Sequence, residues 1–413
     1  MHPSSLQIKD FTYDLPEEKI ARYPLPHRDQ SKLLIYKNGC LSEDTYQHLE
    51  QHIPDQSLLV FNQTKVIHAR LLFQKPTGGK IEVFCLEPDE RYPDVQTAML
   101  QRGSVYWKCM VGGAAKWKDG QQLSLEVAGD KSNAPLVMTA IIDEKKEGYF
   151  VLQLNWNTDL SFAEALHIAG HVPLPPYLNR AAELSDETRY QTIFAREEGS
   201  VAAPTAALHF TEDVLNKLTS KDIATGFVTL HVGAGTFKPV KSETMQDHDM
   251  HAEWIEVTSG FLQQIIDQLH SQKPVIAVGT TSARTLESLY WIGVRLKRND
   301  IEHLDGVAVP QWYPYDNNSD FTATEIFEFL KLHMHNHQMS KLITRTQIII
   351  APGYVFRVID GLITNFHQPQ STLLLLVSAL VGNDWRNIYD YALQHDFRFL
   401  SYGDGCLLWN NNV

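Results

Sequence analysis

The stretch VIAVGTTSARTLESL, residues 275–289, decides the fold class of this chain. It begins with an uninterrupted apolar run, which is typical of a buried strand. Gly279 then supplies a turn, and Thr280, Thr281 and Ser282 provide cap residues before a helix. A buried strand followed by a turn and a helix is the repeating unit of an α/β domain.

Similar units lie on both sides of this stretch. Apolar strand candidates occur at 226–232 (GFVTLHV) and 348–354 (IIIAPGY). Helix starts are indicated by cap residues at three places, namely Ser161 with Glu164, Thr211, and Thr322 with Glu325. Because strands alternate with helices, we expect an α/β main domain.

Residues 57–156 have a different pattern, with about seven short β-type runs and no helix signal. The connections KPTGGK and EKKEG predict antiparallel hairpins. This count fits a small antiparallel barrel. We therefore expect an all-β barrel domain at 57–156, inserted into an α/β catalytic domain formed by 1–56 and 157–413.

The composition is that of a soluble globular protein. The chain has 413 residues, 43% hydrophobic and 21% charged, and a net charge of -13, which argues against a sequence-blind binder of polyanions. The four cysteines are widely spaced and form no CxxC pair. We expect a cytoplasmic protein without a membrane span, because the longest apolar stretch is about half of what a span requires.

Two segments have the features of ligand sites. The start of the predicted helix at Thr280 presents free N–H groups, three hydroxyls and Arg284 to an anion. Gly233 and Gly235 follow a strand in HVGAGTFKP, where a ligand can approach the backbone. On spacing alone, an ordinary strand-to-helix turn and a plain glycine turn explain these segments equally well or better.

Histidines and basic residues offer further candidates. His209, His231 and His367 lie in segments rich in small or turn residues, where an imidazole near a pocket could accept a proton. His248 and His251 have a spacing that a metal could use, but solvated or core histidines explain them better, and we expect no metal. Basic residues around the first hairpin could contact phosphates, or could simply be a solvated strand face.

Taken together and in this order, the motifs match those of one known family. DFTYDLPEEKIARYPLPHRDQSKLLI (10–35), VFNQTKVIHARL (60–71), VAAPTAALHF (201–210), LHVGAGTF (230–237), AVGTTSARTLES, LITNFH (362–367) and YGDGCLL span nearly the whole chain. On these strings the sequence resembles the S-adenosylmethionine:tRNA ribosyltransferase-isomerases of the queuosine pathway. The resemblance also implies an α/β domain with an inserted β-barrel.

The resemblance implies a transferase-isomerase of tRNA modification. Its expected co-substrate is S-adenosylmethionine, which donates its ribosyl part, and no prosthetic group is expected. The acceptor is the aminomethyl-deazaguanine base, preQ1, at the wobble position in the tRNA anticodon loop. The products are epoxyqueuosine-tRNA, adenine and methionine.

The resemblance also assigns roles to individual residues. A sulfonium acidifies the adjacent ribose C–H, so a general base is needed, and His209 is the first candidate, before His231 and His367. The expected tRNA contacts are Arg28, Arg70, Lys80 and Arg196, of which Arg196 could instead pair with Glu197 or Glu198. The expected donor site consists of Gly233, Gly235, Thr236, Thr280, Thr281, Ser282, Arg284 and Asn365.

Some positions depart from the family. Gln63, Lys65, His68 and Ala207 replace the usual Asp, Arg, Pro and Gly, and 295–345 resembles an insertion. These departures concern the acceptor more than the donor. Two alternatives stay open: a tRNA-binding paralogue with another acceptor or no turnover, and a hydrolase with a metal at His248 and His251. We expect a monomer.

Overall fold

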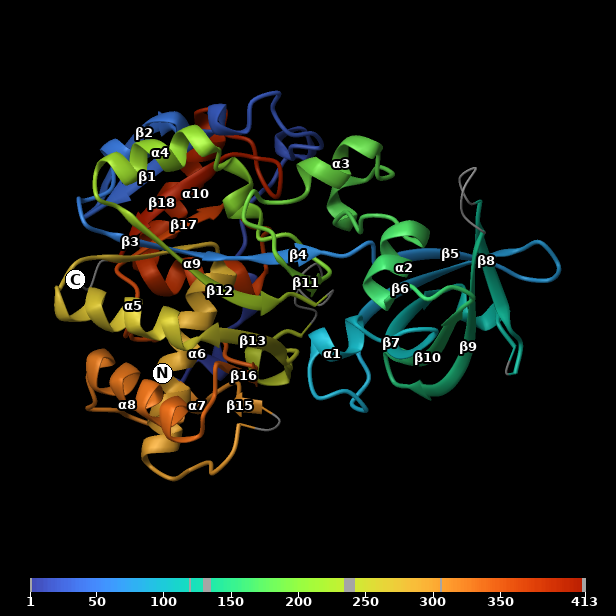
Figure 1. The fold of residues 1–413 in the computed structure, drawn as a ribbon. Helices are drawn as coiled ribbons and strands as arrows, with labels where there is room; N and C mark the ends of the chain where they lie inside the picture. Colours follow the sequence, from blue (N-terminus) through green and yellow to red (C-terminus); the bar gives the residue numbers. More distant parts are fainter. Residues whose placement is uncertain (1, 119, 129–134, 234–241, 305–306, 411–413) are drawn as a thin grey trace.

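The structure, a computed structural model, describes residues 2–118, 120–128, 135–233, 242–304 and 307–410. Figure 1 shows two lobes, a large one built of helices around a sheet and a smaller one built of strands. The fold is an α/β domain with an inserted antiparallel β-barrel, as the sequence predicts.

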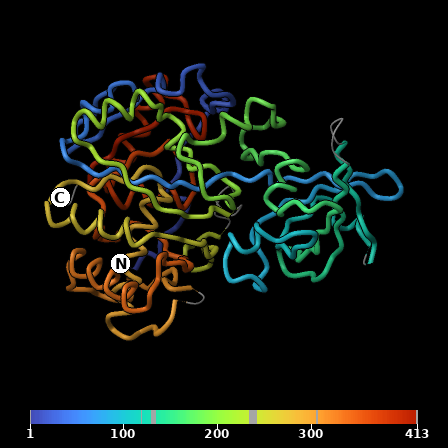
Figure 2. The backbone as a smooth tube through the Cα atoms, in the orientation of Figure 1, coloured from blue at the N-terminus to red at the C-terminus, as the bar shows by residue number. Residues whose placement is uncertain are grey.

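The large lobe contains a ten-stranded mixed sheet in the order β15-β16-β13-β12-β3-β14-β17-β18-β1-β2. Its central strands β12, β3, β14 and β17 are parallel, and β1 pairs in parallel with β18 from the other end of the chain. Figure 2 shows the first and last segments, blue and red, in the same lobe. The strands are β1 Lys32–Lys37, β2 Cys40–Thr45, β3 Leu58–Asn62, β12 Ala224–His231, β13 Glu253–Thr258, β14 Val275–Val278, β15 Val307–Val309, β16 Lys341–Thr346, β17 Gly361–Asn365 and β18 Gly405–Trp409.

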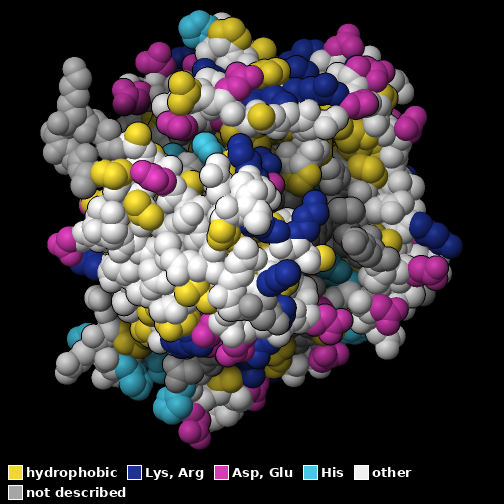
Figure 3. Space-filling view, turned by 90° about the vertical axis from the view of Figure 1, so that its right-hand side faces the viewer, with side chains coloured by type: hydrophobic (Ala, Val, Ile, Leu, Met, Phe, Trp, Pro, Cys, Tyr) yellow, Lys and Arg dark blue, Asp and Glu magenta, His cyan; other side chains and the backbone are white. Residues whose placement is uncertain are grey.

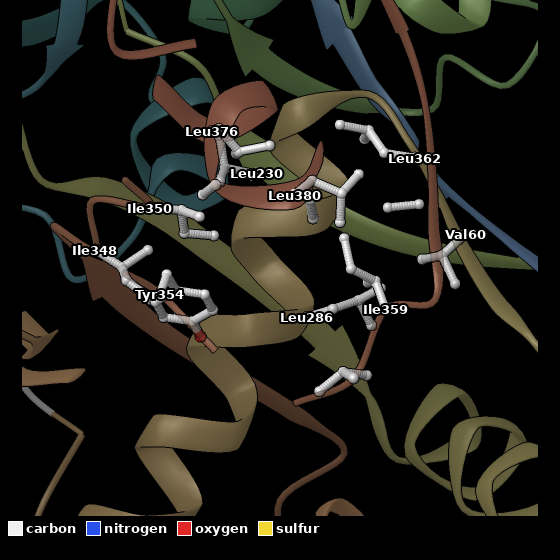
Figure 4. Close-up of a cluster of buried hydrophobic side chains, with 14 of the residues drawn as sticks. Val60, Leu230, Leu286, Ile348, Ile350, Tyr354, Ile359, Leu362, Leu376 and Leu380 are labelled. Carbon is white, nitrogen blue, oxygen red and sulfur yellow. The ribbon is translucent and has the colours of Figure 1, made fainter. Parts of the chain in front are cut away.

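Helices cover both faces of this sheet, so its central strands are apolar on both sides. Leu58 and Val60 of β3 pack in one core cluster, whereas Leu59 and Phe61 pack in another. Figure 4 shows the first cluster, in which Leu286 and Leu380 lie near Val60 and Leu362. The helices are α1 Val95–Met99, α2 Phe162–Ala169, α3 Leu184–Arg189, α4 Glu212–Ser220, α5 Ser259–His270, α6 Thr280–Lys297, α7 Tyr313–Asp316, α8 Ala323–Asn336, α9 Thr372–Val381 and α10 Trp385–Gln394.

The smaller lobe is a closed six-stranded antiparallel barrel in the order β10-β7-β6-β5-β8-β9. Six of the seven runs predicted for 57–156 form it, but the first run is the sheet strand β3, so the predicted start at residue 57 is too early. The burial pattern gives the reason, because β3 is buried at every residue whereas β5 alternates. The segment also contains the short helix α1. The barrel strands are β5 Arg70–Gln74, β6 Lys80–Pro88, β7 Ser104–Gly112, β8 Leu123–Val127, β9 Leu136–Lys146 and β10 Tyr149–Trp156.

The barrel leaves and rejoins the α/β domain at neighbouring points. The backbone N–H of Arg70 donates to the carbonyl of His171 at 3.3 Å, and the N–H of His171 donates to the carbonyl of Arg70 at 2.9 Å. Beside this neck, β4 Thr64–Val66 and β11 Glu197–Ser200 form a two-stranded parallel sheet. We propose that the inserted unit runs from Arg70 to Trp156.

The predicted helix caps are confirmed. Ser161 and Thr322 form capping boxes with Glu164 and Glu325, and Thr211 caps α4. The predicted strand at 348–354 is wrong, because these residues form no strand, although 348–351 and Tyr354 are buried. Among the described residues, no helix is both long and apolar enough to cross a membrane.

Candidate active site

A cavity of about 770 Å³, which includes its open mouth, lies where β14 and β17 end. Ligands of open α/β sheets bind at the carboxyl ends of the strands. We call this hollow at the ends of β14 and β17 the central cavity. The described residues that line it have aromatic, aliphatic, small, hydroxyl or amide side chains, together with one histidine, and none of them is Lys, Arg, Asp or Glu. They are Tyr177, Tyr190, Ala202, Ala203, Pro204, Thr205, Ala206, Val232, Gly279, Thr280, Thr281, Thr364, Asn365, Phe366, His367, Gln368, Ser371, Leu373, Leu400 and Ser401.

The first turn of α6 forms one wall of the central cavity. Gly279 precedes the helix with a φ of 90°, which favours glycine, and has no side chain to cap the free N–H groups. Thr280 and Thr281 line the cavity, and the Thr281 hydroxyl is buried with no hydrogen-bond partner. Ser282 does not line it, because its hydroxyl donates to the Val278 carbonyl at 2.9 Å. The helix therefore offers backbone donors and two hydroxyls to a ligand.

Arg284 lies away from the central cavity. Its guanidinium forms a buried ion pair with Glu253, and its Nε donates to the carbonyl of Ile348 at 3.3 Å. It lines a different hollow of about 2590 Å³, which we call the interdomain cleft because barrel residues such as Lys108 line it as well. The structure thus separates Arg284 from the two threonines with which the sequence grouped it.

Asn365 and His209 form a hydrogen-bonded unit behind the cavity wall. The Asn365 amide accepts from the Thr205 hydroxyl at 2.7 Å, and its Nδ2 donates to His209 Nε2 at 3.1 Å. His209 is also hydrogen-bonded to the Arg28 backbone and stacks on Tyr46 with ring centroids 4.5 Å apart. Burial lowers the pKa of His209 to about 4. Both ring nitrogens are therefore occupied, and His209 is not among the residues that line the cavity.

His367 is the histidine that lines the central cavity. Its Nε2 lies 2.9 Å from the Thr364 hydroxyl, and its backbone N–H donates to the Tyr389 hydroxyl at 3.0 Å. Burial lowers the pKa of His367 to about 3, so the ring is neutral near neutral pH. Of the three predicted candidates for a base, His367 has the position from which it could act.

His231 and the glycine-rich segment lie next to the cavity. His231 ends β12, 3.4 Å from the Thr64 hydroxyl, and burial lowers its pKa to about 4. It does not line the central cavity, whereas the next residue, Val232, does. Gly233 lines the interdomain cleft. Gly235 and Thr236 lie outside the described residues.

The predicted tRNA contacts are spread over the surface. Arg28 donates to backbone carbonyls, Arg70 pairs with Glu82, Lys80 is exposed at the start of β6, and Arg196 lies over the Phe227 ring. Glu198 pairs with Lys65, and Glu197 accepts from Gln96, so neither is the partner predicted for Arg196. Figure 3 views the molecule from the barrel side, where Lys and Arg alternate with Asp and Glu.

His248 and His251 line the interdomain cleft. The pKa of His248 is lowered by burial and by the neighbouring His251. Within the part of the chain that the structure describes, no group of three or more His, Cys, Asp or Glu side chains could hold a metal ion.

The four departures from the family pattern do not line the central cavity. Gln63 donates to Thr229, Lys65 pairs with Glu198, His68 contacts the carbonyl of His167, and Ala207 is buried in the core. The 295–345 stretch forms the end of α6, β15, α7, α8 and most of β16. These differences therefore lie in the framework around the cavity.

Sequence reasoning missed several cavity residues. Tyr177, Tyr190 and Ser401 come from connections far apart in the sequence, and the Tyr177 hydroxyl lies 2.6 Å from that of Ser401. Ser371 caps α9 and lines the cavity. Ser371 alone had a local signal, since a serine directly before a long apolar run is a helix cap.

Comparison with known proteins gives matches over the whole chain. The family model described as "Queuosine biosynthesis protein" matches residues 8–408. A protein of Pelobacter propionicus named S-adenosylmethionine:tRNA ribosyltransferase-isomerase is 36% identical over 404 residues, covering 97% of this chain and 99% of its own. Proteins of the same name from Halothermothrix orenii and Aquifex aeolicus are 37% and 36% identical, each covering 98% of this chain and 100% of its own. A crystal structure titled S-adenosylmethionine tRNA ribosyltransferase, from Thermotoga maritima, is 23% identical, with a TM-score of 0.45 over 96% of this chain and 99% of its own.

Proposed function

The chain belongs to the S-adenosylmethionine:tRNA ribosyltransferase-isomerase family of queuosine biosynthesis, and from this we propose its reaction. It transfers the ribosyl part of S-adenosylmethionine to the preQ1 base at the tRNA wobble position and isomerises it. The products are epoxyqueuosine-tRNA, adenine and methionine. The observation that carries this proposal is the match to proteins of this name over nearly the full length of both chains.

We propose that the nucleoside chemistry takes place in the central cavity. Its described lining combines Tyr177, Tyr190 and Phe366 with hydroxyl and amide groups and has no charged side chain. Aromatic faces suit a nucleobase, and hydroxyl and amide groups suit ribose oxygens. The absence of a carboxylate or a cation from this lining favours a neutral ring system over a phosphate.

The start of α6 is the proposed site of the methionine carboxylate. The first turn of the 18-residue helix α6, at its positive end, has no side-chain cap after Gly279, and Thr280 and Thr281 of this turn line the cavity. A carboxylate placed there is stabilised by the backbone donors and by the helix dipole. Arg284 has no part in this proposal, because its charge is matched by Glu253.

We propose that His367 is the general base. Its imidazole is unprotonated near neutral pH and can accept a proton from the ribose C–H beside the sulfonium. Burial alone sets the low pKa of His367, and this keeps the ring unprotonated and able to accept a proton. His209 has instead a positioning role, since it holds Asn365.

We further propose that the enzyme acts in the cytoplasm as a monomer, with S-adenosylmethionine as a substrate and no prosthetic group. The four cysteines are free thiols, which fits a reducing compartment. Size-exclusion chromatography with light scattering tests the monomer.

The proposed reaction is tested by incubating the protein with S-adenosylmethionine and tRNA that carries preQ1. Mass spectrometry follows adenine, methionine and the nucleosides of the digested tRNA. Release of adenine and methionine together with an epoxyqueuosine nucleoside is the expected result. Binding of both substrates without these products would contradict the proposal.

A further inference from the structure

A second hollow adjoins the central cavity. Its volume is about 250 Å³, which includes the open space at its mouth, and it shares Ser401 with the cavity lining. We call it the arginine hollow, because Arg28 and Arg189 both line it. Its described lining is Pro24, Leu25, Arg28, Ser31, Arg189, Leu208, His209, Ser401 and Tyr402, and this lining contains no carboxylate.

The two guanidiniums are held in place by backbone carbonyls. Arg28 donates to the carbonyls of Gln191 at 3.2 Å and Thr188 at 3.4 Å. Arg189 donates to the carbonyls of Pro26 at 3.0 Å and Leu25. A guanidinium has five N–H donors, so these contacts leave donors over on both residues. The Nε of Arg189 is buried and has no hydrogen-bond partner.

The charge of this pair is uncompensated within the hollow. Arg180 pairs with Asp186, and Arg22 pairs with Glu17, so neighbouring arginines have carboxylate partners. The pKa of Arg28, in contrast, is lowered by burial and by the like charge of Arg189. Two cations held together without an anion are costly, and an anion bound between them removes that cost.

The position of the hollow decides which anion fits. The α6 N-terminus lines the central cavity but not the arginine hollow, and it already provides a site for the carboxylate of the donor. Two planar guanidiniums match the oxygens of a phosphodiester, which can accept from both forks at once. A nucleotide whose base enters the central cavity carries its phosphate to the rim of that cavity.

We propose that Arg28 and Arg189 together bind one backbone phosphate of the tRNA anticodon loop, next to the nucleotide whose base enters the central cavity. This inference rests on the proposed function, since it takes tRNA as the substrate. It adds Arg189, which the sequence did not single out, and it assigns both arginines to the same phosphate.

The test measures tRNA binding by fluorescence anisotropy over a series of salt concentrations, for the wild type, R28Q, R189Q and the double variant. Each single variant is expected to raise Kd about tenfold, and the double variant, which leaves the phosphate without either arginine, is expected to reduce the log–log salt slope by about 0.7, the value for one phosphate on a single strand. Because both arginines share one phosphate, each single variant, in which the other arginine still contacts that phosphate, should keep most of the wild-type slope, whereas a loss of about 0.7 in each single variant would place the two arginines on separate phosphates and overturn the proposal. The matched control is R22Q, an exposed arginine of the same segment that pairs with Glu17, and its slope should not change.

Calorimetric titration with S-adenosylmethionine separates the two possible anions. Unchanged donor affinity with weakened tRNA binding supports the phosphate, whereas weakened donor affinity with unchanged tRNA binding would assign the pair to the carboxylate and overturn the proposal. Should the glutamine variants not fold, R28K and R189K keep the charge without the planar fork and should still weaken tRNA binding several-fold. Wild-type affinity in these lysine variants would overturn it.

Turnover of the wild type separates this inference from the proposed function. If the wild type releases adenine and methionine with precursor tRNA but the variants bind tRNA normally, only the arginine site is wrong. If the wild type gives no products, the proposed function itself fails, whatever the variants bind.

Discussion

The three histidines proposed from the sequence as candidate bases are all buried, but they differ in what their ring nitrogens contact. His209 is bonded on both sides, by Asn365 and by the Arg28 backbone, whereas His367 lines the central cavity beside Thr364. Local sequence gives no hint of this difference, since each of the three histidines directly follows a large apolar residue, namely Leu208, Leu230 or Phe366. Only the packing of distant segments decides which imidazole faces the cavity.

Replacing His367 by Gln should reduce kcat at least 100-fold, because a positioned general base contributes about 10²- to 10⁴-fold. Affinity for S-adenosylmethionine should stay within a few-fold, since Gln can still bond the Thr364 hydroxyl. Single-turnover adenine release and calorimetry measure the two effects. Wild-type kcat in H367Q would exclude His367 as the base.

The sequence allowed residues at the ends of strands to be proposed as site residues. It did not allow us to predict into which cavity a side chain on the following helix points. Thr280, Asn365 and His367 directly follow or end apolar strands, and the fold brings them to one cavity. Arg284 lies one turn after Thr280, yet the cavity reaches only the first turn of α6, and Glu253 of β13 takes the guanidinium. Such a partner from a distant strand cannot be read from spacing.

At the scale of elements, the helix caps could be predicted from the sequence, but the conformation of the apolar run at 348–354 could not. The capping boxes at Ser161 and Thr322 follow from side chains three residues apart, which is local information. The 348–354 run forms no strand, because its polar groups have other partners. Tyr315 bonds the backbone of Ile349 and Ala351, and the segment that follows donates to Glu287.

Glu287 of α6 accepts the backbone hydrogen bonds of the segment after this run, a task that a neighbouring strand performs in a sheet. Its carboxylate is fully buried and accepts from the Tyr354 hydroxyl at 2.8 Å and from the backbone N–H groups of Arg357, Val358 and Ile359 at 3.0–3.2 Å. Burial raises the pKa of Glu287, and these four donors oppose that rise. The segment is therefore fixed to the helix by one side chain.

The E287Q variant should lose about 2–3 kcal/mol of unfolding free energy, since the amide group turns a donor toward groups that are themselves donors. Urea unfolding followed by fluorescence measures the loss. The control is E328Q on α8, where an exposed carboxylate contacts His270 and the change should stay below about 0.5 kcal/mol. Equal stability of both variants would show that the buried carboxylate is dispensable.

The contact of α6 with α8 depends on a small residue. A Cβ added at Gly293 would lie 2.5 Å from Ile326 Cγ2 and 3.0 Å from Leu330 Cγ. G293A should therefore destabilise the protein by about 1–2 kcal/mol, although alanine is by about 1 kcal/mol the better helix former. In G260A on α5 the nearest atom would be 3.8 Å away, so this control should be neutral or stabilising. Thermal unfolding compares the two, and a more stable G293A would contradict this packing argument.

At the scale of the whole molecule, the protein should lose stability in mild acid. Burial lowers the pKa of His209 and His231 to about 4 and that of His367 to about 3, below the unfolded value of about 6.5. Between these values the unfolded chain binds more protons than the native one, so unfolding free energy falls as the pH falls below about 6.5. By pH 5 each histidine should cost on the order of 2 kcal/mol.

Urea unfolding at pH 7.5, 6 and 5 measures this dependence, and H231Q isolates one group of the three. The pH dependence of H231Q should be shallower than that of the wild type by about one proton near pH 5. Identical slopes for both proteins would contradict a buried, neutral His231.

The two-part architecture was predictable because the pattern of burial changes along the chain. Buried and more exposed residues alternate along barrel strands such as β5, whereas every residue of the central sheet strand β3 is buried. This difference also explains why the predicted barrel start at residue 57 was too early, since it included β3 in the barrel. The closure of the barrel and the pairing of Arg70 with His171 at its neck are long-range contacts. No local pattern specifies them.

The pairing of β1 with β18 sets an order of events during synthesis. Leu33 pairs with Gly405, so β1, the second strand from the sheet edge, has no partner on one side until β18 has been translated. Contacts between such distant residues form slowly, whereas the barrel, whose strands follow one another directly, can close while the ribosome is still at work. Ser401, which lines both the central cavity and the arginine hollow, lies in the turn shortly before β18, which begins at Gly405. Both proposed binding surfaces therefore stay incomplete until the segment around Ser401 has been translated, well after the barrel, and a nascent chain that lacks this segment has no finished site with which to capture its substrates.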